Sequence, residues 1–337
     1  MTLRHILCVA AILGGYTAGA QLRPTAHVDV ETRLGYYNYS IDGDALHDRN
    51  GFKCDYLNVA LSGDIIPQVS YFWRQRINKH SPSDDVLAAT DMLYAEYRPS
   101  DQWQFTAGKQ ALAVGTYEYN RAPIDIYTAS DFWGSLPCYQ FAVQATYKVN
   151  HGNDAFTFQF SESPFRTPEY NDIYAYHLMW VGHHGPLSTL YSVNLIEWRP
   201  SHYISYLALG HSFSLGRATF ELDLINRAAA HQTFLFRNCT VSADCSLVCH
   251  KRLNAFAKFT YDVNHTNTPA DLTVLPGTEI TTWGAGVEYF PFDAAGHNLR
   301  LNACINYAHG HNADPSADFL SNLLRINIGL TYKLKLL

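Results

Sequence analysis

Charged and aromatic side chains gather in one long polar segment, Gln110–Pro137. Inside a channel, opposed charges on such a segment would set up a transverse field across the narrowest section, which would discriminate between ions. Arg74 and Arg76 share one parity on an earlier segment and could face these acids. We therefore predict a pore constriction made of Arg74, Arg76, Lys109, Tyr117, Glu118, Arg121, Asp125 and Asp131. The alternative is that the segment packs on a rim with its charges solvated.

Period-two alternation along the chain indicates that strands position these residues. In Leu324–Leu336, the even-numbered positions are Leu, Ile or Tyr, and most odd-numbered ones are polar or charged. Successive side chains of a strand point to opposite faces, so one face is apolar and the other polar. The pattern recurs over 139–148, 218–225, 282–289 and 299–307. Apolar faces begin or end in aromatic residues, as is typical of membrane girdles: Trp103, Tyr139, Tyr147, Tyr289, Tyr307 and Tyr332.

The connections alternate strictly between short turns and longer polar segments. The turns are predicted at 66–67, 99–101, 150–153, 184–186, 215–216, 250–251 and 293–296. The longer segments are Asp42–Lys53, Asn78–Asp85, Gln110–Pro137, Ser161–Asp172, Glu197–His202, Asn226–Asn238, Val263–Thr278 and His309–Ser321. This arrangement predicts an all-β, antiparallel transmembrane barrel of about sixteen strands, with short periplasmic turns, long external loops and both termini periplasmic. Ile173–Val181 and Thr240–Val248 are its least regular strands.

The N-terminus and composition indicate export. Residues 1–20 combine Arg4 and His5, an apolar run and the small residues Ala18-Gly19-Ala20, as in a removable signal peptide. We expect a single barrel over 21–337, located in a bacterial outer membrane. With a formal charge of -6, the chain lacks the excess of basic residues that is typical of nucleic-acid-binding proteins. A soluble glycan-binding sandwich would show similar alternation, but the aromatic bands and long strands favour the membrane.

Catalytic and metal-binding patterns are weak, so we expect no enzyme, cofactor or metal. The pairs Asp84-Asp85 and His47-Asp48 are the nearest match to the rim residues of a barrel protease. A barrel phospholipase would be expected to carry a His-x-Ser dyad, and the sequence contains none. The histidines at 183–184 and 309–311 lack neighbouring ligands of suitable spacing. Cys239, Cys245 and Cys249 share one parity and fit an apolar face better than a disulfide. An outer-membrane barrel enzyme and a surface-binding barrel remain the alternatives.

Several short motifs resemble the phosphate-selective porin O and P family, in a form similar to Bacteroidetes members. They are Gly108-Lys109-Gln110 with Ala113-Val114-Gly115, then Tyr117–Arg121, Pro123-Ile124-Asp125, Ser130–Trp133, Gly277–Thr281 and Glu288–Pro291. The resemblance implies a sixteen-stranded, usually trimeric barrel whose third external loop folds into the lumen. It also implies passive diffusion of small hydrophilic solutes or ions, including anions such as phosphate.

Two features depart from that family. Its phosphate-selective members line the pore with Arg and Lys, whereas the inward parity here is nearly balanced in charge. The basic positions are Arg33, Arg74, Arg76, Lys148, Lys258, Arg300, Arg325 and Lys333, and the acidic ones are Asp29, Glu31, Asp64, Glu96, Glu221, Asp223 and Glu288. The chain also ends in Leu337, where many outer-membrane barrels end in an aromatic residue.

Overall fold

The computed structural model describes residues 24–79, 86–232, 235–292 and 299–336. The predicted signal peptide, Asp84-Asp85 and the predicted turn at 293–296 lie outside these residues. The described chain forms one antiparallel sheet of seventeen strands. One of them, β2 (Asp44–Ala45), is a two-residue pair within the first long connection, so sixteen strands build the wall.

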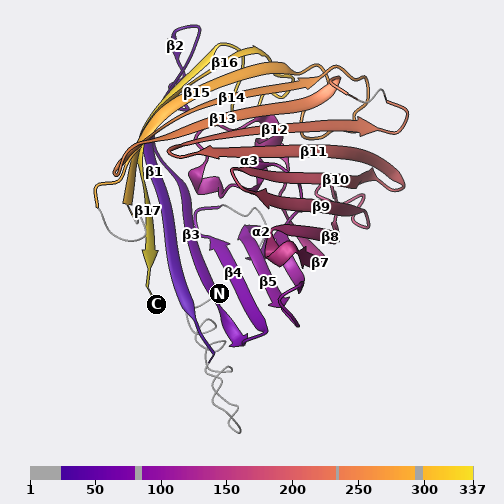
Figure 1. Cartoon of the computed structure of the whole chain (residues 1–337). Coiled ribbons are helices and arrows are strands. Elements are labelled where there is room, and N and C mark those ends of the chain that lie inside the picture. The colour runs from indigo at the N-terminus through magenta and orange to yellow at the C-terminus, as the bar shows by residue number, and fades with distance from the viewer. Residues whose placement is uncertain (1–23, 80–85, 233–234, 293–298, 337) are drawn as a thin grey trace.

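The wall is a closed barrel (Figure 1). Each wall strand pairs with the next along the chain, and β1 pairs with β17 from Asp29↔Lys335 to Ile41↔Leu323, which closes the sheet. The strands are β1 (His27–Ile41), β3 (Gly51–Ile66), β4 (Val69–Arg76), β5 (Thr90–Tyr97), β6 (Trp103–Ala111), β7 (Tyr139–Val149), β8 (Asp154–Glu162), β9 (Tyr174–His184), β10 (Leu187–Arg199), β11 (His202–Leu215), β12 (Ala218–Ala229), β13 (Asn238–His250), β14 (Leu253–Asn264), β15 (Glu279–Tyr289), β16 (Leu299–His311) and β17 (Leu323–Lys335). Closure leaves no unpaired strand edge in lipid, which a membrane-spanning sheet requires.

The predicted strand count and fold class are confirmed. Short and long connections alternate as far as the described residues show, except at one place. The two least regular strands form as β9 and β13. One connection differs, because the predicted loop Glu197–His202 shortens to Pro200 and Ser201 between β10 and β11. Ser201 adopts a φ of 61°, and a register shift between Glu197 and Arg199 lets both strands continue to this tight turn.

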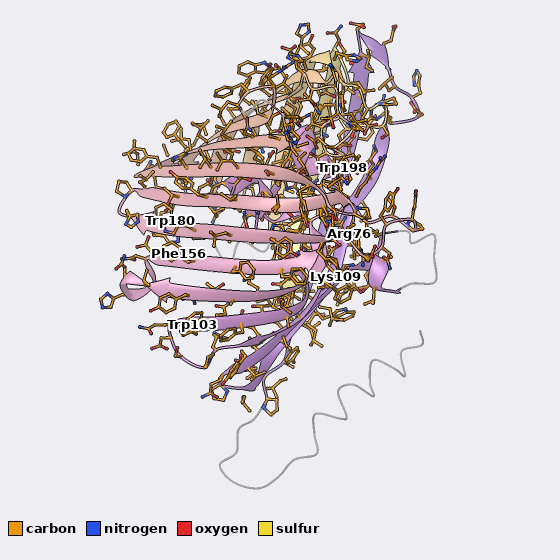
Figure 2. All side chains as sticks on the ribbon, turned by 90° about the vertical axis from the view of Figure 1, so that its right-hand side faces the viewer. Arg76, Trp103, Lys109, Phe156, Trp180 and Trp198 are labelled. Carbon is orange, nitrogen blue, oxygen red and sulfur yellow. The ribbon has the colours of Figure 1, made fainter. Side chains whose placement is uncertain are left out.

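The outer face of the wall is apolar, and aromatic rings cluster near its short-turn end. Trp103 packs on Tyr147 with ring centroids 4.7 Å apart, and Phe156 stacks on Trp180 at 6.4 Å. Trp103, Phe156 and Trp180 lie toward one end of neighbouring strands (Figure 2). Amphipathic rings at this level match the interface between lipid and water. Among the described helices, none is long and apolar enough to span a bilayer.

Long connections fill part of the lumen. Residues 112–138, 163–173 and 265–278 contribute Phe132, Phe165 and Val274 to an apolar cluster on the inward side of β9–β12. In a second cluster, Phe319 of the connection 312–322 packs against Tyr37. This burial explains why Ile225 is apolar on an inward parity that is otherwise charged. The water-accessible part of the lumen is therefore displaced from β9–β12 toward the other strands.

Candidate functional site

The third connection, residues 112–138, crosses the inside of the barrel, as predicted. It contains the short helices α3 (Tyr117–Asn120) and α4 (Asp131–Ser135) with the 3-10 turn η1 (Pro123–Asp125) between them. The side chains of Thr116 and Ser130 cap the two α-helices by accepting hydrogen bonds from Tyr119 N and Trp133 N. Serine and threonine favour this position because they satisfy amide groups that have no partner within the helix.

Two aspartates on the inner face of the wall bind the N-terminal ends of α3 and α4. Asp223 on β12 accepts hydrogen bonds from Tyr117 N at 2.9 Å and Glu118 N at 2.8 Å. Asp262 on β14 accepts one from Asp131 N at 2.9 Å. Carboxylates are favourable at helix N-termini, where free amide groups point outward. The wall thereby fixes the path of the third connection across the lumen.

A buried ion pair adds a third anchor. Lys258 Nζ of β14 lies 2.7 Å from Glu118 Oε1, and each side chain is only 4% exposed. Glu118 also accepts hydrogen bonds from Ser130 N at 2.9 Å and Ser130 Oγ at 2.5 Å. Glu118 thus ties α3 to α4 and both to the wall. Since its carboxylate is fully engaged, Glu118 acts as an anchor and does not face a free passage.

Charged pairs link the rest of the connection to β12–β17. Arg121 pairs with Asp244 at 3.0 Å and with Glu221. Asp125 lies 2.7 Å from Arg300 and 3.4 Å from Lys333. Burial opposes ionisation of Asp125, but Arg300 and Lys333 together hold its pKa below the usual value. Glu118 and Asp125 therefore face basic residues of β14–β17, whereas Arg74 and Arg76 pair elsewhere.

A basic cavity of about 550 Å³ separates the third connection from β3–β6. Arg74 and Arg76 of β4 both approach Asp91 Oδ2, at 3.4 Å and 3.2 Å, and Asp91 is buried. Lys79, which is exposed, and Arg121 also line this space. Its wall thus presents more cationic than anionic groups, although the lumen as a whole is nearly balanced.

Two residues of this region differ from their predicted places. Lys109 touches the cavity but shares the outward face of β6 with Phe105, and its Nζ donates to Leu87 O at 2.7 Å. It belongs to the rim and not to a constriction. Tyr139, predicted for the outer girdle, lies at the start of β7 and accepts a hydrogen bond from Arg74 Nη2 at 2.5 Å, so it faces inward.

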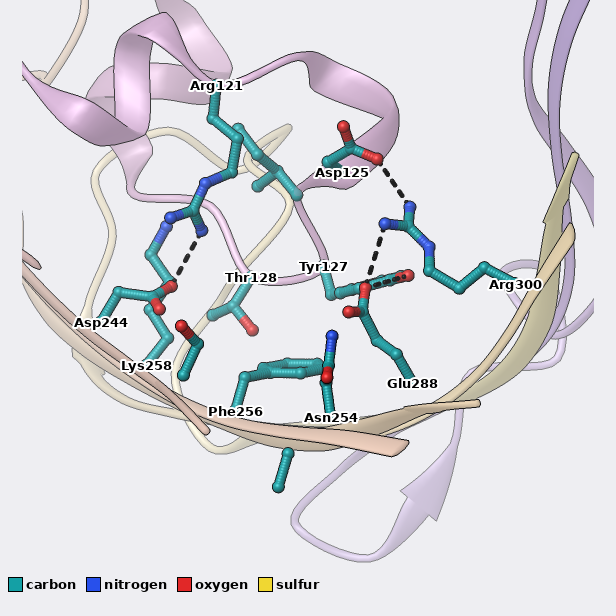
Figure 3. Close-up of a pocket in the computed structure, with 13 residues that line it drawn as sticks. Arg121, Asp125, Tyr127, Thr128, Asp244, Asn254, Phe256, Lys258, Glu288 and Arg300 are labelled. Atoms are coloured by element: carbon teal, nitrogen blue, oxygen red, sulfur yellow. Dashed lines mark hydrogen bonds and ion pairs between the residues drawn. The ribbon is translucent and has the colours of Figure 1, made fainter. Parts of the chain in front are cut away.

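A second cavity of about 340 Å³ lies between the third connection and β13–β16 (Figure 3). Arg300 bridges Asp125 and Glu288, the latter at 3.1 Å, while Tyr127 donates to Glu288 at 3.1 Å. Arg121 lines both this cavity and the basic one. The two spaces therefore meet the third connection at the same arginine.

The remaining predicted residues lie apart from both cavities. Tyr117 is half-buried beside Asp223, and Asp131 lines a third cavity of about 350 Å³ with Asp262 and Asp314. Burial and the neighbouring Asp262 carboxylate raise the pKa of Asp131. No sequence pattern indicated that Asp223 and Asp262 cap helices, although Asp223 was expected to face inward. Asp91 was missed because it lies at an irregular register at the start of β5.

The histidine, cysteine and acidic side chains of the described residues do not gather into a metal-binding cluster. No group of three or more His, Cys, Asp or Glu side chains in that part of the chain is arranged to hold a metal ion. The six described cysteines carry free thiols, and Cys239 is buried while Cys249 is exposed. His184 lies 3.1 Å from Asp154 near a short turn, within the aromatic band. These groups are explained by local packing.

The fold of the chain resembles the folds of several solved porins. The solved structures it resembles include an anion-selective porin from Comamonas acidovorans (TM-score 0.65, 9% identity, 93% of this chain and 100% of that one). They also include the outer-membrane channel DcaP of Acinetobacter baumannii (TM-score 0.64, 10% identity, 95% and 99%) and Salmonella typhi OmpF in complex with daunomycin (TM-score 0.63, 11% identity, 92% and 97%). A search of curated proteins finds no match.

These structural likenesses establish the fold, and the family comes from a separate comparison. The family model described as phosphate-selective porin O and P matches residues 27–190, which run from β1 into β10 and include the third connection. This match assigns residues 27–190 to the phosphate-selective porin O and P family of outer-membrane channels.

Proposed function

We propose that this porin is a passive diffusion channel that favours small hydrophilic anions, and that they pass between the third connection and β3–β6. The observation that carries the proposal is the composition of the basic cavity. Its lining includes the basic residues Arg74, Arg76 and Lys79. Among the described residues that line it, only Asp91 is acidic. A lumen lined by an excess of basic side chains attracts anions and repels cations.

The near balance of inward charge does not oppose this proposal, because the charges are segregated. On the side of β12–β17, acids and bases neutralise one another in direct pairs, such as Glu118 with Lys258 and Asp125 with Arg300. On the side of β4, two arginines share one carboxylate. A permeating ion responds to the charges that line its own path, which here are mainly positive.

The route continues, in this proposal, past Arg121 into the second cavity. Arg121 lines both cavities and is 29% exposed, so it presents a positive group where the two spaces approach each other. Glu221 and Asp244 hold its guanidinium in place. Of the predicted constriction, we retain Arg74, Arg76, Arg121 and Asp125 as lumen residues and assign Glu118 to anchoring.

Transport of this kind needs no catalytic step, so we propose that the chain is not an enzyme. We also propose that it is exported with removal of residues 1–20, is embedded in outer-membrane lipid and assembles as a homotrimer. Apolar residues such as Val193 and Ile328 on the outer face, 56% and 64% exposed, offer surface for lipid or for a neighbouring subunit. Chemical crosslinking in mild detergent tests the trimer, and a product limited to monomers would contradict it.

The experiment that tests the channel is single-channel recording of the refolded mature protein in a planar bilayer. We expect stepwise conductance increments with chloride as the main charge carrier, and competition by added inorganic phosphate. A folded barrel that inserts without conductance would contradict the channel. A conducting barrel with a preference for potassium would contradict the anion path alone.

A further inference from the structure

The basic cavity is larger than an inorganic anion needs. Its volume of about 550 Å³ falls in the range of roughly 300–1,000 Å³ that is typical of sites for organic molecules. Such sites combine an apolar or aromatic lining with a few convergent polar groups. The cavity has this composition, since four aromatic side chains and several aliphatic ones surround its arginines.

Two aromatic rings of the wall hold the arginines in place. The guanidinium carbon of Arg76 lies 4.9 Å from the ring centroid of Tyr56, and that of Arg74 lies 5.2 Å from the ring centroid of Tyr139. At these distances the ring face attracts the cation. Each guanidinium is therefore fixed beside an aromatic ring. A solute that binds the guanidinium can also contact that ring.

The two guanidiniums already converge on one carboxylate. Arg74 Nη2 and Arg76 Nη2 lie 3.4 Å and 3.2 Å from the same oxygen of Asp91. The Nε of each arginine is buried without a hydrogen-bond partner among the described residues. Because one acid cannot neutralise two guanidiniums, this pair retains positive charge for a second oxyanion.

The third connection supplies aromatic surface from the opposite side. Trp133 of α4 and Tyr119 of α3 both line the cavity, as does Leu136, which follows α4. Trp133 is half-buried, so part of its indole ring remains accessible. A solute that enters here meets arginines on the wall and an aromatic surface on the third connection.

We propose that this cavity binds organic anions in which a carboxylate or phosphate ester group is attached to a flat apolar body. The acidic group pairs with Arg74 and Arg76, while the body packs between Tyr56 and Trp133. This inference rests on the proposed anion channel and narrows its solutes. A bare inorganic anion makes the first contact without the second, so it passes with weaker retention.

The test compares benzoate with acetate as blockers of chloride current through the full-length mature porin. Both carry the same carboxylate, and only benzoate has a ring. We expect benzoate to halve the chloride conductance at a concentration at least about tenfold lower than acetate, since ring packing adds to the ion pair. Equal block by both would overturn the inference.

Variants on the two sides of the cavity localise the effect. W133A on the third connection and Y56L on the wall should each reduce the benzoate-to-acetate ratio at least about threefold, with block scaled to each variant's own conductance in KCl. F158L is the matched control, because Phe158 is 52% exposed on the outer face of β8, and its ratio should stay as in the parent. Unchanged ratios in both cavity variants would overturn the inference.

The same recordings separate this inference from the channel proposal. The reversal potential in a KCl gradient measures anion preference without any organic solute. An anion-preferring channel that does not distinguish benzoate from acetate keeps the proposed function and rejects the organic-anion site. A channel without anion preference rejects the proposed function, whatever its response to benzoate.

Discussion

Removal of Lys258 from its pair with Glu118 should destabilise the barrel through an uncompensated buried charge. The two groups are 2.7 Å apart and each is only 4% exposed, so the Glu118 carboxylate that remains is largely shielded from bulk water. Breaking such a pair costs about 3–5 kcal/mol. We therefore expect K258M to lower the free energy of unfolding by roughly that amount.

A double variant separates charge from packing. E118Q/K258M removes both charges, and the glutamine carbonyl can still accept from Ser130 N, whose distance to Glu118 is 2.9 Å. Replacing both partners of a buried pair is often close to neutral, so the double variant should recover most of the loss. K333M is the matched control: Lys333 is 40% exposed and lies 3.4 Å from Asp125, so its pair is worth at most about 1 kcal/mol.

The assay is urea unfolding in detergent micelles, followed by tryptophan fluorescence. If K258M unfolds at the same urea concentration as the parent, Glu118 is not a buried anchor. If the double variant is as unstable as the single one, the loss comes from packing and the electrostatic reasoning is wrong.

Three further predictions address the third connection and the termini. Deletion of Tyr117–Phe132, which removes the inward segment, should raise single-channel conductance, and an unchanged value would place the constriction elsewhere. Burial and the neighbouring Asp262 raise the pKa of Asp131 from the ordinary 3.8 to about 7, so the fold loses stability as pH rises from the lower value to the higher one. D131N should thus raise the melting temperature at about pH 8 and change it little at about pH 3, where the acid is protonated in the folded and the unfolded chain alike; an equal rise at both would refute this. Mass spectrometry of the exported protein should find Gln21 at its N-terminus, and retention of residues 1–20 would contradict the signal peptide.

The wall of the barrel could be predicted from sequence because its signals are local. Alternation fixes which side chains share a face, and polar breaks fix where strands end. The outward parity of Lys109 could also be predicted, since Trp103 and Phe105 assign it to the outer face. Tyr139 was different, because a residue at the first position of a strand can turn inward over the rim.

The interior of the barrel could be predicted only in outline. The length and charge of Gln110–Pro137 indicated an inward loop, but the wall partners of Glu118 come from strands more than one hundred residues away. Lys258 and Asp223 show this, as each meets Glu118 only after the barrel closes. Likewise, the connection 265–278 packs inward through Asp271, which lies 2.7 Å from the fully buried Arg227. Tertiary geometry of this kind leaves no periodic pattern in the sequence.

If solutes pass the arginines of β4, as proposed, R74Q/R76Q should change the selectivity of the channel. A unit charge about 5 Å from an ion in water contributes about 0.8 kcal/mol, which is roughly a fourfold change in occupancy. The reversal potential of parent and variant should be measured in the same KCl gradient. We predict an anion-preferring parent and a variant whose anion-to-cation permeability ratio is roughly tenfold lower. Identical reversal potentials for two folded, conducting proteins would show that permeating ions do not pass Arg74 and Arg76.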